Sequence, residues 1–114
     1  MRFRVVDDTP EVAAFVGVWL RGQGHDVEVT TSSFPDLLGP EPWDGVDVAV
    51  VDLTLPQVNG LDILRHLADE HPHVKRVAFS AMAEPGDEVY GLADLVLSKP
   101  IGAQEFLVAL EAMG

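Results

Sequence analysis

Val46–Asp52, with the sequence VDVAVVD, decides the fold, because it is an almost continuous apolar run that ends in a carboxylate. Such a run is typical of a central strand in a parallel sheet, where helices cover both faces and no alternation with polar residues is needed. In open α/β sheets the ligands bind beyond the carboxyl ends of the strands. Asp52 is therefore expected at the edge of the sheet where ligands bind.

Four more short segments have the composition of strands, and between them apolar residues recur with the period of a helix. This alternation predicts an α/β fold, a doubly wound three-layer sandwich with a five-stranded parallel sheet. The other expected strands are Phe3–Asp7, Asp26–Thr30, Val74–Phe79 and Leu95–Leu97.

Five helices are expected to connect and follow these strands. Thr9 is a suitable N-cap for the first helix, and Pro10 suits its first position. The apolar stripe of this helix comprises Val12, Phe15, Val16, Trp19 and Leu20. The other expected helices are Phe34–Leu38, a helix from Asn59 or Gly60 to His71, a weak helix within Ala83–Ala93, and Ala103–Met113.

The weak helix is expected to be short. Pro85 and Gly86 disfavour helix before about Asp87, and Gly91 weakens the far end. After the neighbouring strand and loops are subtracted, about two turns of 3.6 residues remain.

The composition argues against several classes of function. The net charge is −12, from nineteen acidic and seven basic side chains, which disfavours direct nucleic-acid binding by this domain. The absence of cysteine excludes disulfides and thiolate sites. No apolar stretch approaches the roughly eighteen residues of a membrane helix, and no signal peptide is apparent. These features predict one cytoplasmic domain over residues 1–114, without a membrane contact.

The carboxyl ends of the expected strands carry the residues with chemical potential. The first strand ends in Asp7 and Asp8, the third in Asp52 and the fourth in Ser80, and the fifth reaches Lys99. Three carboxylates this close repel one another, and a hard cation such as Mg²⁺ relieves the repulsion. One carboxylate can then act as a nucleophile and form an acyl phosphate. A lysine and a hydroxyl are suitable donors to phosphoryl oxygens.

These residues lie in four ordered motifs that together resemble the receiver domains of two-component response regulators. The motifs are VVDD at 5–8, VVDLTLPQVNG at 50–60, FSA at 79–81 and LSKP at 97–100. The resemblance covers essentially the whole chain. It implies a flavodoxin-like sheet with strand order 2-1-3-4-5.

The resemblance also implies a role for each site residue. Asp52 is the phosphoryl acceptor. Mg²⁺ is bound by Asp8 with support from Asp7, by Asp52, and by the backbone carbonyl of Thr54.

Two further side chains are implied to act on the phosphoryl group. Ser80 hydrogen-bonds it and Lys99 pairs with it. The bond between Lys99 and Pro100 matches a Lys-Pro bond that is often cis in the family.

The implied function is that of a signalling domain in a two-component system or phosphorelay. A sensor histidine kinase or phosphotransfer protein donates the phosphoryl group, and the domain then alters its contacts with an effector domain or downstream protein. It is not an enzyme beyond catalysis of its own phosphoryl transfer and dephosphorylation. The 114 residues are either the whole protein or a piece of a longer response regulator.

Three positions depart from the family pattern. Val96 stands where receivers usually carry Tyr or Phe, so the aromatic that reports phosphorylation is missing. Thr54 and Met82 flank the path of the hydrolytic water, which predicts an unusual phosphoryl lifetime. Without the aromatic, a signal is expected to travel mainly through the Ala81–Asp87 loop.

Two alternatives from other classes remain. A receiver-like module could bind partners without phosphorylation, which the absent aromatic favours and the intact aspartates and Lys99 disfavour. A hydrolase of the haloacid-dehalogenase type also uses an aspartate at a strand end. That class requires a second aspartate two residues later, where this chain has Thr54.

The remaining histidines and tryptophans are interpreted as structural. His66 and His71 are five residues apart, which does not place them on one helical face. They are expected at the surface, as are His25 and His73 in loops. Trp19 is expected in the core, and Trp43 is expected to cover a loop.

Overall fold

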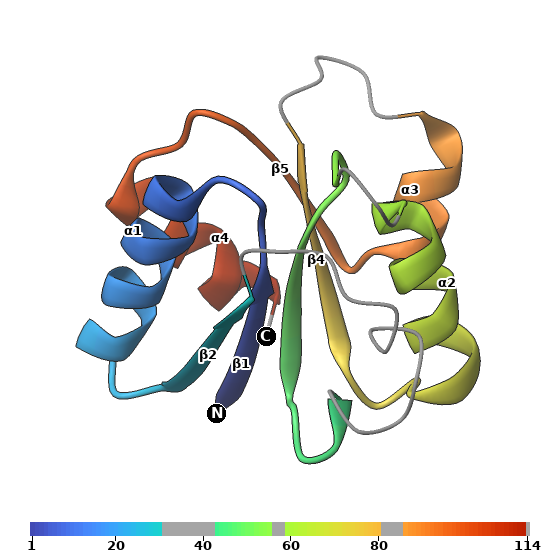
Figure 1. Cartoon of the computed structure of the whole chain (residues 1–114), viewed down its shortest axis with the longest axis horizontal. Helices are drawn as coiled ribbons and strands as arrows, with labels where there is room; N and C mark the ends of the chain where they lie inside the picture. Colours follow the sequence, from blue (N-terminus) through green and yellow to red (C-terminus); the bar gives the residue numbers. More distant parts are fainter. Residues whose placement is uncertain (31–42, 56–58, 81–85, 114) are drawn as a thin grey trace.

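The computed structural model describes residues 1–30, 43–55, 59–80 and 86–113 (Figure 1). Five parallel strands form one sheet in the order β2-β1-β3-β4-β5. This confirms the expected fold class and strand order. The strands are β1 (Arg2–Val6), β2 (Asp26–Thr30), β3 (Val48–Asp52), β4 (Lys75–Ser80) and β5 (Leu95–Ser98).

The register of the sheet brings the carboxyl ends of its strands to one edge. Val6 pairs with Val51 across β1 and β3, and Asp52 pairs with Phe79 across β3 and β4. Ser80 pairs with Ser98 at the ends of β4 and β5. The residues that follow these strands are therefore neighbours in space, although they are far apart in the sequence.

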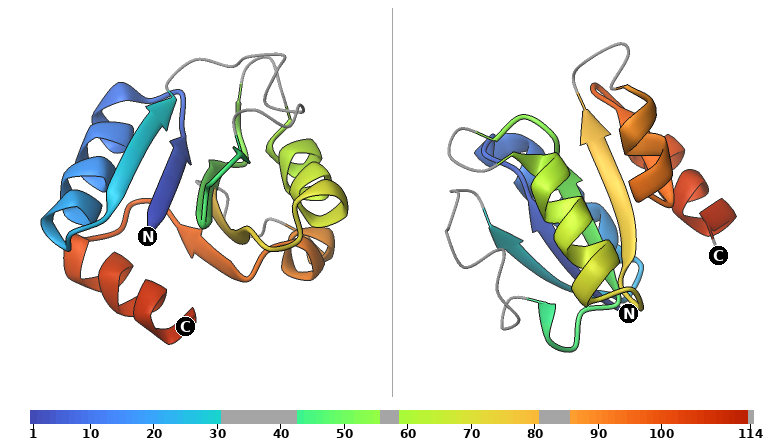
Figure 2. Two further views of the ribbon diagram at one scale, coloured as in Figure 1. Left: turned by 90° about the horizontal axis from the view of Figure 1, so that it is seen from below. Right: turned by 90° about the vertical axis from the view of Figure 1, so that its right-hand side faces the viewer.

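Helices cover both faces of the sheet, as Figures 1 and 2 show. On one face lie α1 (Pro10–Gly22) and α4 (Ala103–Met113). On the other lie α2 (Gly60–Glu70) and α3 (Asp87–Leu92). The expected helix over Phe34–Leu38 lies outside the described residues. No helix in the described part of the chain is long and apolar enough to cross a membrane.

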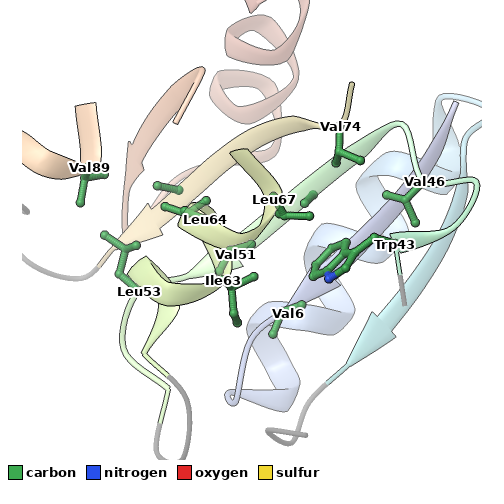
Figure 3. Close-up of a cluster of buried hydrophobic side chains, with 12 residues drawn as sticks. Val6, Trp43, Val46, Val51, Leu53, Ile63, Leu64, Leu67, Val74 and Val89 are labelled. Carbon is green, nitrogen blue, oxygen red and sulfur yellow. The ribbon is translucent and has the colours of Figure 1, made fainter. Parts of the chain in front are cut away.

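Among the described residues, the core consists of two apolar clusters, one on each face of the sheet. Trp43 belongs to the cluster under α2, where its side chain has no exposed surface (Figure 3). It packs with Ile63 and Leu67 of α2 and was expected only to cover a loop. Trp43 is therefore a core residue, because the turn before β3 folds back over the sheet beside α2.

The first helix differs in detail from its sequence pattern. Thr9 occupies the N-cap position, but its side chain makes no capping hydrogen bond. The residues buried along α1 are Ala13, Val16, Gly17 and Leu20. Phe15, expected on the apolar stripe, is 59% exposed. The small residues Ala13 and Gly17 let the helix approach the sheet, which turns Phe15 outward.

The short helix is confirmed. α3 has six residues, which is less than two turns, and it begins after Gly86, whose φ is +99°. Its Val89 is fully buried against the cluster under α2. Arg65 of α2 donates a hydrogen bond of 2.7 Å from Nε to Glu88 of α3. Residues 81–85 lie outside the described part, so the expected signal through that loop stays a prediction.

Candidate functional site

Three aspartates meet where β1 and β3 end at the carboxyl edge of the sheet. Asp7, Asp8 and Asp52 each offer an oxygen atom within 4.8 Å of the oxygen atoms of the other two. Asp7 and Asp52 are buried, whereas Asp8 is exposed. The sequence predicted this cluster from strand ends alone, and the parallel register of β1 and β3 brings the side chains together.

Lys99 joins the two buried aspartates. Its Nζ lies 2.7 Å from Oδ2 of Asp7 and 3.3 Å from Oδ2 of Asp52. The Lys99 backbone N–H donates a hydrogen bond of 2.8 Å to the carbonyl of Ser80, which continues the pairing of β4 with β5. The Lys99–Pro100 peptide bond is cis, as the motif predicted. The strand end therefore sets where the ammonium group lies.

The two buried carboxylates are held in the same way. Oδ1 of Asp7 accepts a hydrogen bond of 2.9 Å from the Thr9 N–H. Oδ1 of Asp52 accepts a hydrogen bond of 2.9 Å from the Thr54 N–H. In both cases the donor lies two residues later, as in an Asx turn. Each carboxylate thus has one oxygen fixed by the backbone and the other directed at Lys99.

The pKa of Asp52 is raised from 3.8 to about 6. Burial is the largest cause, because it removes the charged carboxylate from water. The charge of Asp7 and a hydrogen bond with the Asp8 side chain raise this pKa further, whereas the Thr54 N–H and the charge of Lys99 lower it. The fold therefore destabilises the ionised form of Asp52 relative to an exposed aspartate, although this carboxylate is still mostly ionised at neutral pH.

Gly60 brings the start of α2 directly onto the end of β3. A Cβ at this position would lie 2.4 Å from the carbonyl oxygen of Asp52 and 2.7 Å from the Cα of Leu53. Only glycine allows this approach without a shift of the backbone. Gly60 was expected only as a possible start of this helix. The signal for its further role is that glycine is a poor helix former at the first position of a helix.

The donor set fits Mg²⁺. Three carboxylates face one ammonium group here, so the cluster keeps an excess of negative charge. All-oxygen donors suit a hard divalent cation that retains water molecules. The cluster of Asp7, Asp8 and Asp52 therefore suits a bound Mg²⁺ ion.

The other two predicted site residues lie beside the cluster. Ser80 is the last residue of β4 and is buried. Thr54 is exposed and follows Asp52 by two residues, with its N–H on that carboxylate. The structure thus brings all of the predicted residues to one edge of the sheet.

The histidines differ from their sequence interpretation. The rings of His66 and His71 are in edge contact, with centroids 5.2 Å apart, and His73 lies 6.3 Å beyond His71. The expectation that His66 and His71 do not share a face assumed a continuous helix. His71 lies beyond the end of α2 with a φ of −136°, so its ring turns back toward His66.

The chain is similar to known proteins along nearly its whole length. The family model of the response regulator receiver domain matches residues 3–111. The transcriptional regulatory protein TrcR of Mycobacterium tuberculosis is 31% identical over 99% of this chain and 45% of its own length. The DNA-binding response regulator MtrA of Mycolicibacterium smegmatis is 32% identical over 97% of this chain and 49% of its own length. The chain spans about half the length of these relatives.

Solved structures show the same fold. A CheY-like receiver domain from Methylobacillus flagellatus has a TM-score of 0.85 and 26% identity, with 100% of this chain and 98% of that chain covered. The response regulator TrrA from Thermotoga maritima, solved in complex with Mg²⁺ and BeF, has a TM-score of 0.85 and 17% identity over 99% of this chain and 98% of its own. With the family model matching nearly all of its length, the chain belongs to the receiver domains of response regulators.

Proposed function

We propose that Asp52 accepts a phosphoryl group from a sensor histidine kinase or a phosphotransfer protein, in a step that requires Mg²⁺. The observation that carries this proposal is the arrangement around Lys99, whose Nζ contacts both Asp7 and Asp52. A buried carboxylate at a strand end, with a fixed cation beside it, suits a nucleophile that gains charge on reaction. Asp7 and Asp8 then serve the metal ion rather than the nucleophilic step.

The proposed step is a displacement at phosphorus. Oδ2 of Asp52 attacks the phosphorus atom of a phosphohistidine, and a new O–P bond forms as the P–N bond breaks. The electron pair of the broken bond returns to the imidazole, whose other nitrogen already carries a proton, so a neutral histidine leaves. The product is an acyl phosphate on Asp52. The nucleophile must be ionised to react. Because the raised pKa of Asp52, about 6, still lies below neutral pH, the carboxylate remains reactive there.

The chain supplies several groups for this step. Lys99 donates from Nζ to the phosphoryl oxygens, and the Ser80 hydroxyl is proposed as a second donor. The Thr54 N–H holds the other carboxylate oxygen of Asp52 in place, so the attacking oxygen faces Lys99.

A bound Mg²⁺ would be held by Asp7, Asp8 and Asp52 together with the backbone carbonyl of Thr54. It would supply positive charge that offsets the carboxylates and the oxygens of the transferred group. Ion pairing with Lys99 already engages Asp7, so we assign Asp7 a supporting part beside Asp8.

The later fate of the phosphoryl group is also part of the proposal. Hydrolysis of the acyl phosphate by the domain itself resets the site, with Thr54 beside the path of the water. The relatives are named as transcriptional or DNA-binding regulators, and this chain matches about half of each. We propose an effector domain or a downstream protein as the partner that responds to phosphorylation, with residues 1–114 acting as the receiver unit.

The test is intact mass after incubation of the chain with acetyl phosphate and Mg²⁺. We expect one added phosphoryl group that is absent without Mg²⁺ and absent in Asp52→Asn. Asp69→Asn, an exposed aspartate of α2, is the matched control and should label like the parent. Labelling of Asp52→Asn at the parent rate would refute the assignment of the acceptor.

The same experiment separates the alternatives. No labelling under any phosphodonor would favour a receiver-like interaction module that works without phosphorylation. The hydrolase alternative has less support, because Asp7 and Asp8 lie within the cluster and Thr54 replaces its second aspartate.

A further inference from the structure

Lys99 has a third contact that the proposed phosphoryl chemistry does not use. Its Nζ lies 5.3 Å from the centroid of the Phe79 ring, within the range of a cation–π interaction. Phe79 is the penultimate residue of β4 and is 3% exposed. The ammonium group is therefore held between two carboxylates on one side and an aromatic face on the other.

Phe79 is the first ring of a continuous series that we name the aromatic column: Phe79, Phe106, Trp19 and Phe15. The centroids of Phe79 and Phe106 are 6.0 Å apart and the rings are stacked. Phe106 of α4 lies 5.7 Å from Trp19 of α1, and Trp19 lies 6.4 Å from Phe15. All of these distances fall in the range of interacting aromatic pairs.

The aromatic column connects the site to solvent. Phe79 and Phe106 are buried, Trp19 is half-buried, and Phe15 is exposed on α1. One surface pocket of about 560 Å³ is lined by Lys99 and Phe79 and also by Phe15 and Trp19. The same side chains are thus linked both through ring contacts and along one hollow of the surface.

The aromatic column lies on the face of the sheet opposite to α3. Phe79 and its neighbour Leu97 of β5 belong to the cluster under α1 and α4. Val96, one residue earlier on β5, packs against the cluster under α2. A conformational change that passes along the aromatic column is therefore transmitted on the face of the sheet that α1 and α4 cover. Val96 packs on the other face and takes no part in it.

We propose that Phe79 is a positioning residue for Lys99, and that the aromatic column reports the state of Asp52 at Trp19 and Phe15. This inference rests on the proposed function and names a regulatory route from the same site. A phosphoryl group adds about 1.5 to 2 negative charges and competes with the Phe79 ring for the ammonium group. Because Phe106 fills the space behind Phe79, a shift of Phe79 moves its neighbours in a close-packed core.

Trp19 gives a direct test. The chain has two tryptophans, so Trp43→Phe leaves Trp19 as the sole indole emitter. The probe is Mg²⁺ with beryllium fluoride, which adds to a carboxylate as a mimic of the phosphoryl group. We expect the emission of Trp19 to change on titration with beryllium fluoride in Mg²⁺, and not with Mg²⁺ alone. Circular dichroism establishes that the Trp43→Phe variant, which is the reference protein in this experiment, is folded.

The variant that tests the positioning role is Phe79→Leu in the Trp43→Phe background. We expect the Trp19 response to disappear and the half-saturating concentration of beryllium fluoride, measured by protection against urea unfolding, to rise about twofold to fivefold. Phe3→Leu is the matched control, because Phe3 is buried in the same cluster but outside the aromatic column. It should retain the Trp19 response.

Each outcome decides one of the two claims. An unchanged half-saturating concentration of beryllium fluoride in Phe79→Leu would overturn the positioning role. A Trp19 response that survives in Phe79→Leu, or that Phe3→Leu also abolishes, would overturn the route through the column. A parent protein that is labelled by acetyl phosphate but shows no Trp19 response would overturn the route through the column. A parent that responds to beryllium fluoride but is never labelled would contradict the proposed phosphorylation and leave the column supported.

Discussion

Lys99 lies closer to Asp7 than to Asp52, with its Nζ at 2.7 Å from the first and 3.3 Å from the second. The ammonium group therefore neutralises the aspartate next to the expected metal site better than it neutralises the acceptor. This asymmetry leaves Asp52 with a carboxylate that burial and the charge of Asp7 make costly to ionise. The ionised form of the acceptor Asp52 is thus electrostatically destabilised before any cation or phosphoryl group binds.

The first prediction follows from the raised pKa of Asp52. Between pH 4 and 6 the folded protein holds a proton on Asp52 that the unfolded chain has released, because the pKa is about 6 in the fold against 3.8. The contribution of Asp52 to the stability of the metal-free domain therefore falls as the pH rises through this range. Asp52→Asn lacks this loss and should be more stable above pH 6 by on the order of 1–3 kcal/mol.

Urea unfolding of both proteins without divalent cations, at pH 4 and at pH 7, measures this difference. The comparison is needed because other carboxylates titrate in the same range. Asp69→Asn, which changes an exposed aspartate, should follow the parent within about 0.5 kcal/mol. A variant Asp52→Asn that is less stable than the parent at pH 7 would contradict the argument.

The second prediction concerns the loss of Lys99. Lys99→Ala leaves Asp7 and Asp52 without the cation that contacts both of them. Removal of one partner from a buried pair leaves an uncompensated charge, so we expect a loss of about 1–3 kcal/mol in the unfolding free energy. Mg²⁺ should restore part of this loss, because a cation that binds only the folded state stabilises it.

Lys75→Ala is the matched control, since it removes the other lysine from the opposite end of β4. It should change stability little and gain no more from Mg²⁺ than the parent does. If Lys99→Ala melts like the parent without metal, the ion pairs contribute nothing to the fold.

The sequence was sufficient to predict the sheet and the residues at its edge. The strand Val48–Asp52 is a continuous apolar run that ends in a carboxylate, and this pattern is evident in the sequence. The parallel register of β1 and β3 then brings Asp7 and Asp52 together, independently of the conformation of the loops. The site was therefore predictable because it depends on strand ends and not on the packing of helices.

Packing details could not be predicted in this way. A helical stripe gives the apolar face of α1 only to within one residue position, so the exposure of Phe15 depended on how closely Ala13 and Gly17 approach the sheet. The burial of Trp43 depended on a turn that folds back toward α2. The Gly60 contact is a distance between two backbones. The sequence shows a glycine at the start of a helix but not the backbone atoms that it approaches.

The third prediction tests the Gly60 contact. Gly60→Ala places a Cβ 2.4 Å from the carbonyl oxygen of Asp52, so either β3 or α2 must move. We expect a loss of about 2–3 kcal/mol in stability, as for other overpacked sites. Because the displaced backbone carries the acceptor and precedes Thr54, the concentration of Mg²⁺ needed to protect the fold should also rise.

Gly91→Ala provides the comparison for Gly60→Ala. Gly91 lies in α3, and a Cβ there meets nothing within 4 Å. Alanine is a better helix former than glycine by up to about 1 kcal/mol, so this variant should be neutral or slightly stabilised. Equal destabilisation of both variants would show that steric contact with Asp52 is not the cause.

The fourth prediction concerns α3, whose six residues are too few to be stable alone. Val89 is fully buried against the cluster under α2, whereas Tyr90 is 62% exposed. Val89→Ala should therefore release the helix, with a local cost of about 1–3 kcal/mol and faster hydrogen exchange across residues 87–93. Tyr90→Ala should leave that exchange unchanged, because its ring has little contact to lose.

Hydrogen exchange by mass spectrometry measures both variants, and exchange in α2 serves as the internal reference. Slow exchange of α3 in Val89→Ala would mean that the Arg65 to Glu88 contact, and not burial of Val89, holds this helix on the domain.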